Sequence, residues 1–175
     1  MKKKLKIVAM IPARIGSERL KMKNLALINN KPLISYVISS AKKSKKFDEI
    51  YVNSDHKIFE YITKRYNINF YKRNKKLGGS NIRSDLIVND FLKRNHCDIL
   101  VWINPIAPLQ TPDEIKKIVN YFSKSNYDSL ITSVKKQVHT NYKNKPLNYK
   151  KNQKFLKTQD LNYVELMAYS LMMWK

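Results

Sequence analysis

The stretch that decides the fold is residues 5–25, LKIVAMIPARIGSERLKMKNL. Its first seven residues, LKIVAMI, are almost continuously apolar, which is typical of a strand buried on both faces of a parallel sheet. Residues 12–24 are rich in basic and polar side chains and predict a loop after this strand. Ligands bind beyond the carboxyl ends of the strands in such sheets. The sequence therefore predicts a candidate site in this loop.

Apolar runs alternate with amphipathic stretches along the rest of the chain. Strands are expected at 26–28, 49–53, 68–71, 98–103, 129–134 and 166–174, and helices at 32–42, 57–66, 83–95 and 112–123. Thr111 to Glu114 (TPDE) combines an N-cap, a first-turn proline and a capping-box glutamate, which marks the start of the last helix. The alternation predicts an α/β fold, a Rossmann-like, mostly parallel sheet flanked by helices.

The length and the composition are those of one compact domain. The chain has 175 residues, 43% of them hydrophobic, and shows no internal repeat and no linker. Residues 135–159 are polar and have no clear period. The expectation is a single domain over residues 1–175.

The net charge of +22 raises the question of a nucleic-acid partner. Most of the 35 basic residues are lysines spread along the whole chain, whereas base-reading surfaces lean on arginine forks. The sequence therefore does not favour nucleic-acid binding, although the charge would attract a small anion. Residues 7–11 are too short for the apolar part of a signal peptide, and no apolar run approaches the ~20 residues of a membrane span. A cytoplasmic protein without a membrane segment is expected.

The loop at residues 12–24 concentrates positive charge. It carries Arg14, Arg19, Lys21 and Lys23 within ten residues, next to the neutral donors of Ser17 and Asn24. A triphosphate needs several cations and many hydrogen-bond donors, and this loop offers both. It is not a Walker loop, because G-x-x-x-x-G-K-[ST] is absent. The alternative is a solvated charged turn.

The same loop resembles the signature of sugar nucleotidyltransferases, in particular the cytidylyltransferases of acidic sugars. That signature runs roughly apolar-x-A-R-x-x-S-x-R-L-x-x-K-N-L. The matching positions are Ala13, Arg14, Ser17, Arg19, Leu20, Lys23, Asn24 and Leu25. The resemblance implies that Arg14 and Lys23 are catalytic, binding and polarising the triphosphate of CTP. It also implies that Ala13, Ser17, Arg19 and Asn24 help to bind the nucleotide.

Further segments resemble the family in the same order along the chain. Residues 53–55 (NSD) resemble the family's S-T-D, and Arg73 with Ser84 resembles the element that holds cytosine and ribose. Residues 104–111 (NPIAPLQT) resemble the Q-P-T-S-P-L-R-T loop that faces nucleotide and sugar. The resemblance implies nucleotide binding by Arg73 and Ser84. It also implies sugar binding by Asn104 and Pro105.

The last part of the chain completes the resemblance. Gln159 and Tyr169 resemble positions in the segment and strand that close over the sugar, which implies a role in sugar binding. Asn104, Ala107 and Gln110 replace Gln, Ser and Arg of the family loop, so the identity of the sugar stays open.

A divalent cation is implied by the resemblance, and its ligands are not evident. Family members use Mg²⁺ held by aspartates near the end of a longer chain, and this sequence is expected to lack that part. With 13 acidic residues in all, Asp55 is the one candidate ligand that stands at a strand end. Ser54 and Asp55 could instead cap the helix expected at 57–66.

These observations predict a cytidylyltransferase that transfers CMP from CTP to an acidic keto-sugar of the sialic-acid (nonulosonate) or 3-deoxy sugar-acid type, releasing pyrophosphate. A sugar-1-phosphate nucleotidyltransferase is a chemical alternative, although its first loop is usually richer in glycine. Two alternatives lie in other classes, a non-catalytic or truncated nucleotide-binding protein of the same fold and a basic nucleic-acid-binding protein. The family resemblance also implies a homodimer as a possible assembly.

Overall fold

The computed structural model describes residues 4–151, 154 and 156–175, and the chain divides into two compact units. The first unit comprises the chain up to Leu130 together with Ser170–Lys175, and the second comprises Ile131–Tyr169. The chain passes from one unit to the other within β7 (Ser129–Lys136) and β10 (Val164–Trp174).

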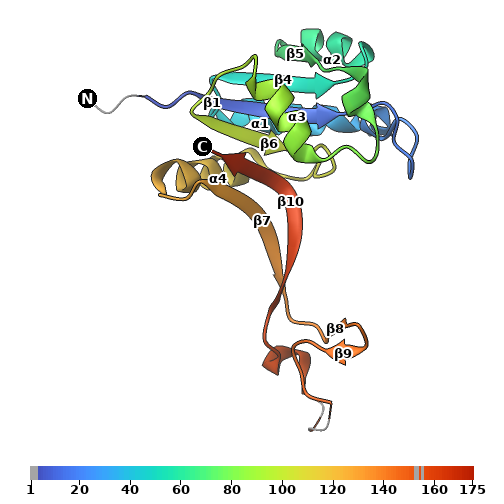
Figure 1. Ribbon diagram of the computed structural model, residues 1–175, viewed down its shortest axis with the longest axis vertical. Helices are drawn as coiled ribbons and strands as arrows, with labels where there is room; N and C mark the ends of the chain where they lie inside the picture. Colours follow the sequence, from blue (N-terminus) through green and yellow to red (C-terminus); the bar gives the residue numbers. More distant parts are fainter. Residues whose placement is uncertain (1–3, 152–153, 155) are drawn as a thin grey trace. The chain divides into compact units, whose positions relative to one another are not determined.

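A six-stranded sheet in the order β5-β4-β1-β6-β10-β7 forms the centre of the fold. Besides β7 and β10, this sheet contains β1 (Ile7–Ala13), β4 (Glu49–Ser54), β5 (Asn69–Lys72) and β6 (Ile99–Ile103). β5, β4, β1 and β6 run parallel, and β10 runs antiparallel to β6 (Figure 1). The mostly parallel sheet confirms the predicted fold class, and it places β1 between β4 and β6.

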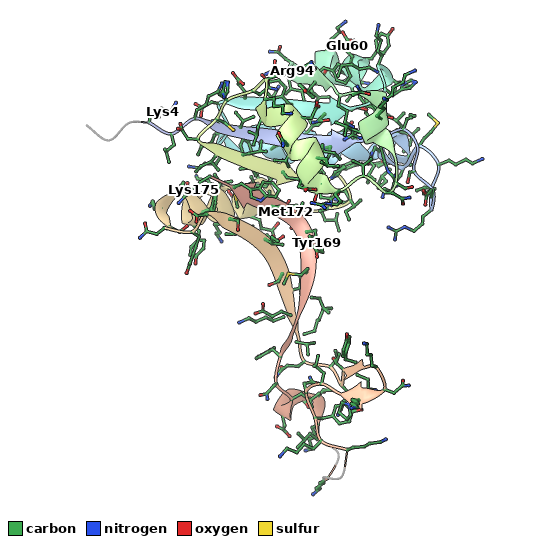
Figure 2. The ribbon with its side chains drawn as sticks, in the orientation of Figure 1. Lys4, Glu60, Arg94, Tyr169, Met172 and Lys175 are labelled. Carbon is green, nitrogen blue, oxygen red and sulfur yellow. The ribbon has the colours of Figure 1, made fainter. Side chains whose placement is uncertain are left out.

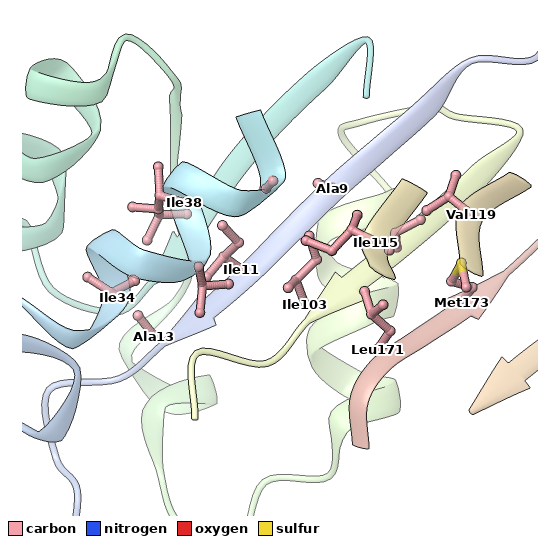
Figure 3. Packing of buried hydrophobic residues seen from close by; sticks show 14 of the residues in the cluster. Ala9, Ile11, Ala13, Ile34, Ile38, Ile103, Ile115, Val119, Leu171 and Met173 are labelled. Carbon is pink, nitrogen blue, oxygen red and sulfur yellow. The ribbon is translucent and has the colours of Figure 1, made fainter. Parts of the chain in front are cut away.

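Helices cover both faces of the sheet. The helices are α1 (Leu33–Ser44), α2 (Ile58–Tyr66), α3 (Ser84–Leu92) and α4 (Pro112–Lys124). Buried side chains of α1, α2 and α4 join one hydrophobic cluster, and those of α3 join the other. The first cluster is shown in Figure 3, where Ile34 and Ile38 of α1 lie beside Ile11 of β1.

The apolar side chains of β1 alternate between the two hydrophobic clusters. Ala9 and Ile11 belong to the α1 side, whereas Val8 and Met10 belong to the α3 side, and all four are fully buried. Successive side chains of a strand point to opposite faces, so a strand covered on both faces must be apolar throughout. The uninterrupted apolar sequence of β1 therefore follows from its central position.

Helix α3 is tied to the edge strand β5 by a buried tyrosine. The hydroxyl of Tyr71 lies 2.9 Å from both the backbone oxygen and the Oδ2 atom of Asp90. Burial and the bond to Asp90 raise the pKa of Tyr71 to about 12, so the hydroxyl stays protonated and can donate. This contact holds α3, whose first residue is Ser84, against the sheet.

The second unit contains a short hairpin in a segment that the sequence left without regular structure. Strands β8 (Asn141–Tyr142) and β9 (Lys145–Pro146) pair antiparallel around Lys143 and Asn144, both with positive φ. Two-residue hairpin turns need positive φ and usually contain glycine. The absence of glycine here explains why the sequence did not indicate the hairpin.

The start of α4 is the capping box that the sequence predicted. The side chain of Thr111 accepts a hydrogen bond from the backbone nitrogen of Glu114 at 3.2 Å, and Glu114 Oε2 accepts one from the nitrogen of Thr111 at 2.8 Å. These bonds satisfy backbone groups that a helix leaves unpaired at its first turn. They also mark the end of the loop that follows β6.

We expect Thr111→Ala to lower the free energy of unfolding by about 1 kcal/mol, because the helix loses its cap. Urea unfolding of the purified chain measures this change. Thr111→Ser keeps the capping oxygen and is the matched control, which we expect to stay close to the wild type. An unchanged unfolding midpoint for Thr111→Ala would contradict the importance of the capping box.

Candidate active site

A cavity of about 280 Å³ in the first unit gathers most of the predicted site residues. Its volume lies near the lower end of the range for small-molecule sites. The predicted residues that line it are Arg14, Ser17, Lys23, Asn24, Arg73, Ser84, Asn104 and Pro105. They come from the segments that follow β1, β5 and β6 and from the first residue of α3. Three loops that are distant in the sequence therefore meet at the carboxyl ends of the parallel strands, as the fold requires.

The loop after β1 is held by its own backbone. Met22 adopts a left-handed conformation, with φ of 52°, and a short 3₁₀ turn, Lys23–Leu25, follows it. The nitrogen of Leu25 donates to the oxygen of Met22 at 2.7 Å. The buried Asn24 lies with its Nδ2 atom 3.5 Å from the backbone oxygen of Arg14. These contacts link the two ends of the loop, so that both Arg14 and Lys23 line the cavity.

The cations of this loop repel one another. Burial, followed by the charges of Arg19 and Arg14, lowers the pKa of Lys23 below the ordinary value of a lysine. Among the described residues that line the cavity, none carries a carboxylate that would offset these charges. A bound polyanion would relieve the repulsion, because it would favour the protonated form of Lys23. The electrostatics of the cavity therefore suit an anionic ligand.

Arg73 brings a third cation to the cavity and is almost completely buried, with 3% of its surface exposed. Its Nη2 atom lies 3.5 Å from the backbone oxygen of Ala13 and 3.7 Å from Oδ1 of Asp55. Its Nε and Nη1 atoms have no hydrogen-bond partner within the part of the chain that the structure describes. Burial lowers the pKa of Arg73, the charge of Asp55 opposes this change and the charge of Arg14 adds to it.

Asp55 does not cap a helix, so that interpretation of the sequence was wrong. Helix α2 begins after Lys57, which makes no side-chain cap bond, and the first helical nitrogen, that of Ile58, donates to Nδ1 of His56 at 3.2 Å. The carboxylate of Asp55 faces Arg73 instead, and the backbone of Gly78 approaches it closely. A Cβ atom added at Gly78 would lie 2.6 Å from Oδ2 of Asp55, so any larger residue here would force this carboxylate to shift. Asp55 thus forms an ion pair with a buried cation.

The donor set of the cavity does not fit a Mg²⁺ ion held by protein carboxylates. Mg²⁺ prefers carboxylate and phosphate oxygens. The lining has no carboxylate, and the described residues contain no group of three or more His, Cys, Asp or Glu side chains that could hold a metal ion. Asp55, the candidate from the sequence, faces Arg73.

The remaining predicted residues lie outside the lining or in the second unit. Ala13 is buried at the end of β1, and its backbone oxygen faces Arg73. Arg19 is exposed and acts on the cavity through its charge on Lys23. Gln159 and Tyr169 belong to the second unit, and the backbone oxygen of Gln159 accepts a bond from Gln137. Tyr169, labelled in Figure 2, is 47% exposed. Their role in sugar binding stays a prediction.

Sequence reasoning missed the apolar part of the cavity. Ile82, Ile87 and Trp102 line it beside the cations. Trp102 lies in the apolar run ILVWI of β6, where a tryptophan cannot be told from any other core residue. Only its position near the carboxyl end of a central parallel strand could have indicated a role in the site.

The fold and the cavity together define an α/β protein with an anion-attracting site at the carboxyl edge of its sheet. A family model described as cytidylyltransferase matches residues 8–169. The chain belongs to this cytidylyltransferase family.

Individual relatives agree with this assignment. The N-acylneuraminate cytidylyltransferase of Oncorhynchus mykiss is 27% identical over 131 residues, covering 74% of this chain and 30% of that protein. The post-translational flagellin modification protein B of Campylobacter coli is 33% identical over 135 residues, covering 73% of this chain and 57% of that protein. The chain thus spans between about a third and somewhat more than half of the length of these relatives.

Solved structures share the fold. The structure of CMP:2-keto-3-deoxy-manno-octonic acid synthetase complexed with CTP aligns with a TM-score of 0.73 and 17% identity, covering 97% of this chain and 74% of that one. Within the described residues, no helix is long and apolar enough to cross a membrane.

We expect Asp55 and Arg73 to be energetically coupled, with a coupling energy of about 1 kcal/mol or more in a double-mutant cycle. The reason is that removing one partner of a buried ion pair leaves the other charge uncompensated. Urea unfolding of the wild type, Asp55→Asn, Arg73→Met and the double variant measures the coupling.

The matched control for this cycle is Asp85→Asn, which removes a carboxylate paired with Arg83 on the surface. Exposed ion pairs contribute little, so this variant should unfold nearly like the wild type. Additive effects of the Asp55 and Arg73 substitutions would contradict the coupling.

Proposed function

We propose that the protein is a cytidylyltransferase that transfers CMP from CTP to an acidic keto-sugar, of the sialic-acid (nonulosonate) or 3-deoxy sugar-acid type, and releases pyrophosphate. The observation that carries the proposal is the convergence of Arg14, Lys23 and Arg73 on one cavity without a carboxylate. Membership of the cytidylyltransferase family supports cytidine as the nucleoside. Relatives named for N-acylneuraminate and 3-deoxy-manno-octulosonate support a sugar acid as the acceptor.

In the proposed reaction, a hydroxyl oxygen of the sugar attacks the α-phosphorus of CTP. The new bond joins this oxygen to the α-phosphorus, and the bond from the α-phosphorus to the α–β bridging oxygen breaks. Its electron pair leaves with pyrophosphate, and the hydroxyl proton is released. Such transfers depend mainly on positioning and on stabilisation of charge. Lys23 and Arg14 would bind the phosphates and offset the charge that develops on the leaving group.

Three further points belong to the same proposal: the sugar contacts, the role of Mg²⁺ and the cellular location. Asn104 and Pro105 line the cavity and would contact the sugar. Mg²⁺ enters only as the counter-ion of the triphosphate, because the described lining offers it no carboxylate. A cytoplasmic location, expected from the sequence, belongs to the same proposal.

We expect the purified chain to bind CTP in preference to ATP, GTP and UTP, and Lys23→Ala to weaken this binding tenfold or more, about 1.4 kcal/mol. The loss of one cation from the triphosphate site is the reason. Isothermal titration in the presence of Mg²⁺ measures both effects. Lys21→Ala removes a nearby exposed lysine that does not line the cavity and is the matched control.

Turnover is tested separately, by pyrophosphate release with CTP and a panel of acidic keto-sugars. Release that depends on the sugar and on Lys23 supports the transferase. Selective CTP binding without release would favour the alternative, a non-catalytic nucleotide-binding protein. Equal, weak binding of all four nucleotides would argue against the proposal, and tight binding of polyanions without preference would favour a nucleic-acid binder.

We also propose that the protein forms a homodimer through its second unit. Among the described residues of this unit, Leu161 is the only buried apolar side chain. The unit exposes many others, including Val138 (46%), Tyr163 (61%), Leu166 (52%) and Met167 (53%). An exposed apolar surface of this kind is typical of an interface.

Sedimentation equilibrium is expected to show a dimer that dissociates when Leu166 and Met167 are both replaced by lysine, because charges would then enter an apolar interface. Leu109→Lys is the control, since Leu109 is 89% exposed and belongs to the first unit. A monomeric wild-type chain would refute the dimer.

A further inference from the structure

Several of the unpartnered buried polar atoms of the described residues lie in the candidate site. Buried polar groups are normally hydrogen-bonded, so each exception calls for an explanation. Oδ1 of Asn24, Nε and Nη1 of Arg73 and Nε1 of Trp102 are buried and lack a hydrogen-bond partner within the described ranges. All three residues line the same cavity. A ligand that supplies the missing partners explains why they occur together.

The family resemblance gives Asn24 and Arg73 a role in nucleotide binding, but it assigns no role to Trp102. It is the penultimate residue of β6 and is only 7% exposed. Its backbone stands in register between Met10 of β1 and Met172 of β10, so the surrounding strands fix its position. An indole offers one N–H donor and no acceptor. The hydrogen-bond partner that Nε1 of Trp102 lacks is therefore an acceptor atom.

The cavity divides by chemistry between the elements that form it. The loop after β1 contributes cations. The apolar residues are Trp102 of β6, Ile82 of the segment before α3 and Ile87 of α3. A triphosphate suits the first group. The second group suits a flat ring with apolar faces and acceptor atoms on its edge, which is the description of a nucleobase.

We propose that Trp102 is a specificity-determining residue that contacts the nucleobase of the bound nucleotide and donates its Nε1–H to an acceptor atom on the base edge. This inference rests on the proposed function, since it needs a nucleotide in the cavity. It adds the residue through which the apolar wall recognises the base. Trp102 acts on the base alone and leaves the phosphates to Arg14 and Lys23.

Titrations with CTP and with inorganic tripolyphosphate separate the two parts of the site. Trp102→Phe keeps an aromatic ring and loses the donor, so it should weaken CTP binding about three- to tenfold, the effect of one hydrogen bond. Binding of tripolyphosphate, which has no base, should not change. Lys23→Ala should weaken the binding of both. Trp174→Phe is the matched control, because Trp174 lines a different hollow beside α3 and should affect neither.

A second measurement keeps Trp102 in place, so its main readout does not depend on the folding of Trp102→Phe. The chain has two tryptophans, so the ¹H–¹⁵N spectrum of the Trp174→Phe protein contains the indole signal of Trp102 alone. Saturating CTP should shift this signal, and tripolyphosphate should leave it in place. In the Trp102→Phe protein, the signal of Trp174 should not respond to CTP.

The outcomes also separate the inference from the proposed function. If Lys23→Ala weakens CTP binding while Trp102→Phe does not, and the indole signal stays in place, the inference is overturned and the proposed function stands. If Trp102→Phe weakens CTP and tripolyphosphate equally, Trp102 has only a structural role and the inference fails again. If the wild-type chain shows no preference for CTP, both fail together.

Discussion

The burial of β1 on both faces is the constraint on which the rest of the structure depends. Its side chains alternate between the cluster under α1 and the cluster under α3, and its backbone pairs with β4 on one side and β6 on the other. Because these strands are parallel, their carboxyl ends lie at one edge of the sheet. The loops that follow β1, β5 and β6 are thereby brought to a common cavity, and the chemistry of the site follows from this arrangement.

This cavity requires that charged side chains be buried, although proteins usually leave such groups exposed to water. Arg73 lies almost fully buried with two nitrogen atoms unpaired, and Lys23 shares its surroundings with two other cations. Asp55 offsets part of this charge, and the close approach of Gly78 leaves room for its carboxylate. An anionic ligand would supply the remaining compensation. This electrostatic demand links the fold to the proposed binding of a nucleoside triphosphate.

The two units differ in how they are stabilised. The first has a layered core with helices on both faces of the sheet, and the side chains of this core are shielded from water. The second has a single buried apolar side chain among its described residues and exposes several others. A unit that buries so little apolar surface gains from a partner that covers it, which is the physical basis of the proposed homodimer.

The sequence by itself determined the α/β class, the capping box of α4 and the loop residues Arg14, Lys23 and Asn24, because apolar period, cap chemistry and a dense motif are local properties of the chain. Three features were decided only by the tertiary structure. Asp55 faces Arg73, which lies 18 positions further along the chain, instead of capping α2. Gly78 leaves room for that same carboxylate. Trp102, hidden in an apolar strand, lines the cavity. Each of these depends on which residues meet across strands and loops, and such long-range meetings leave no periodic signal in the sequence.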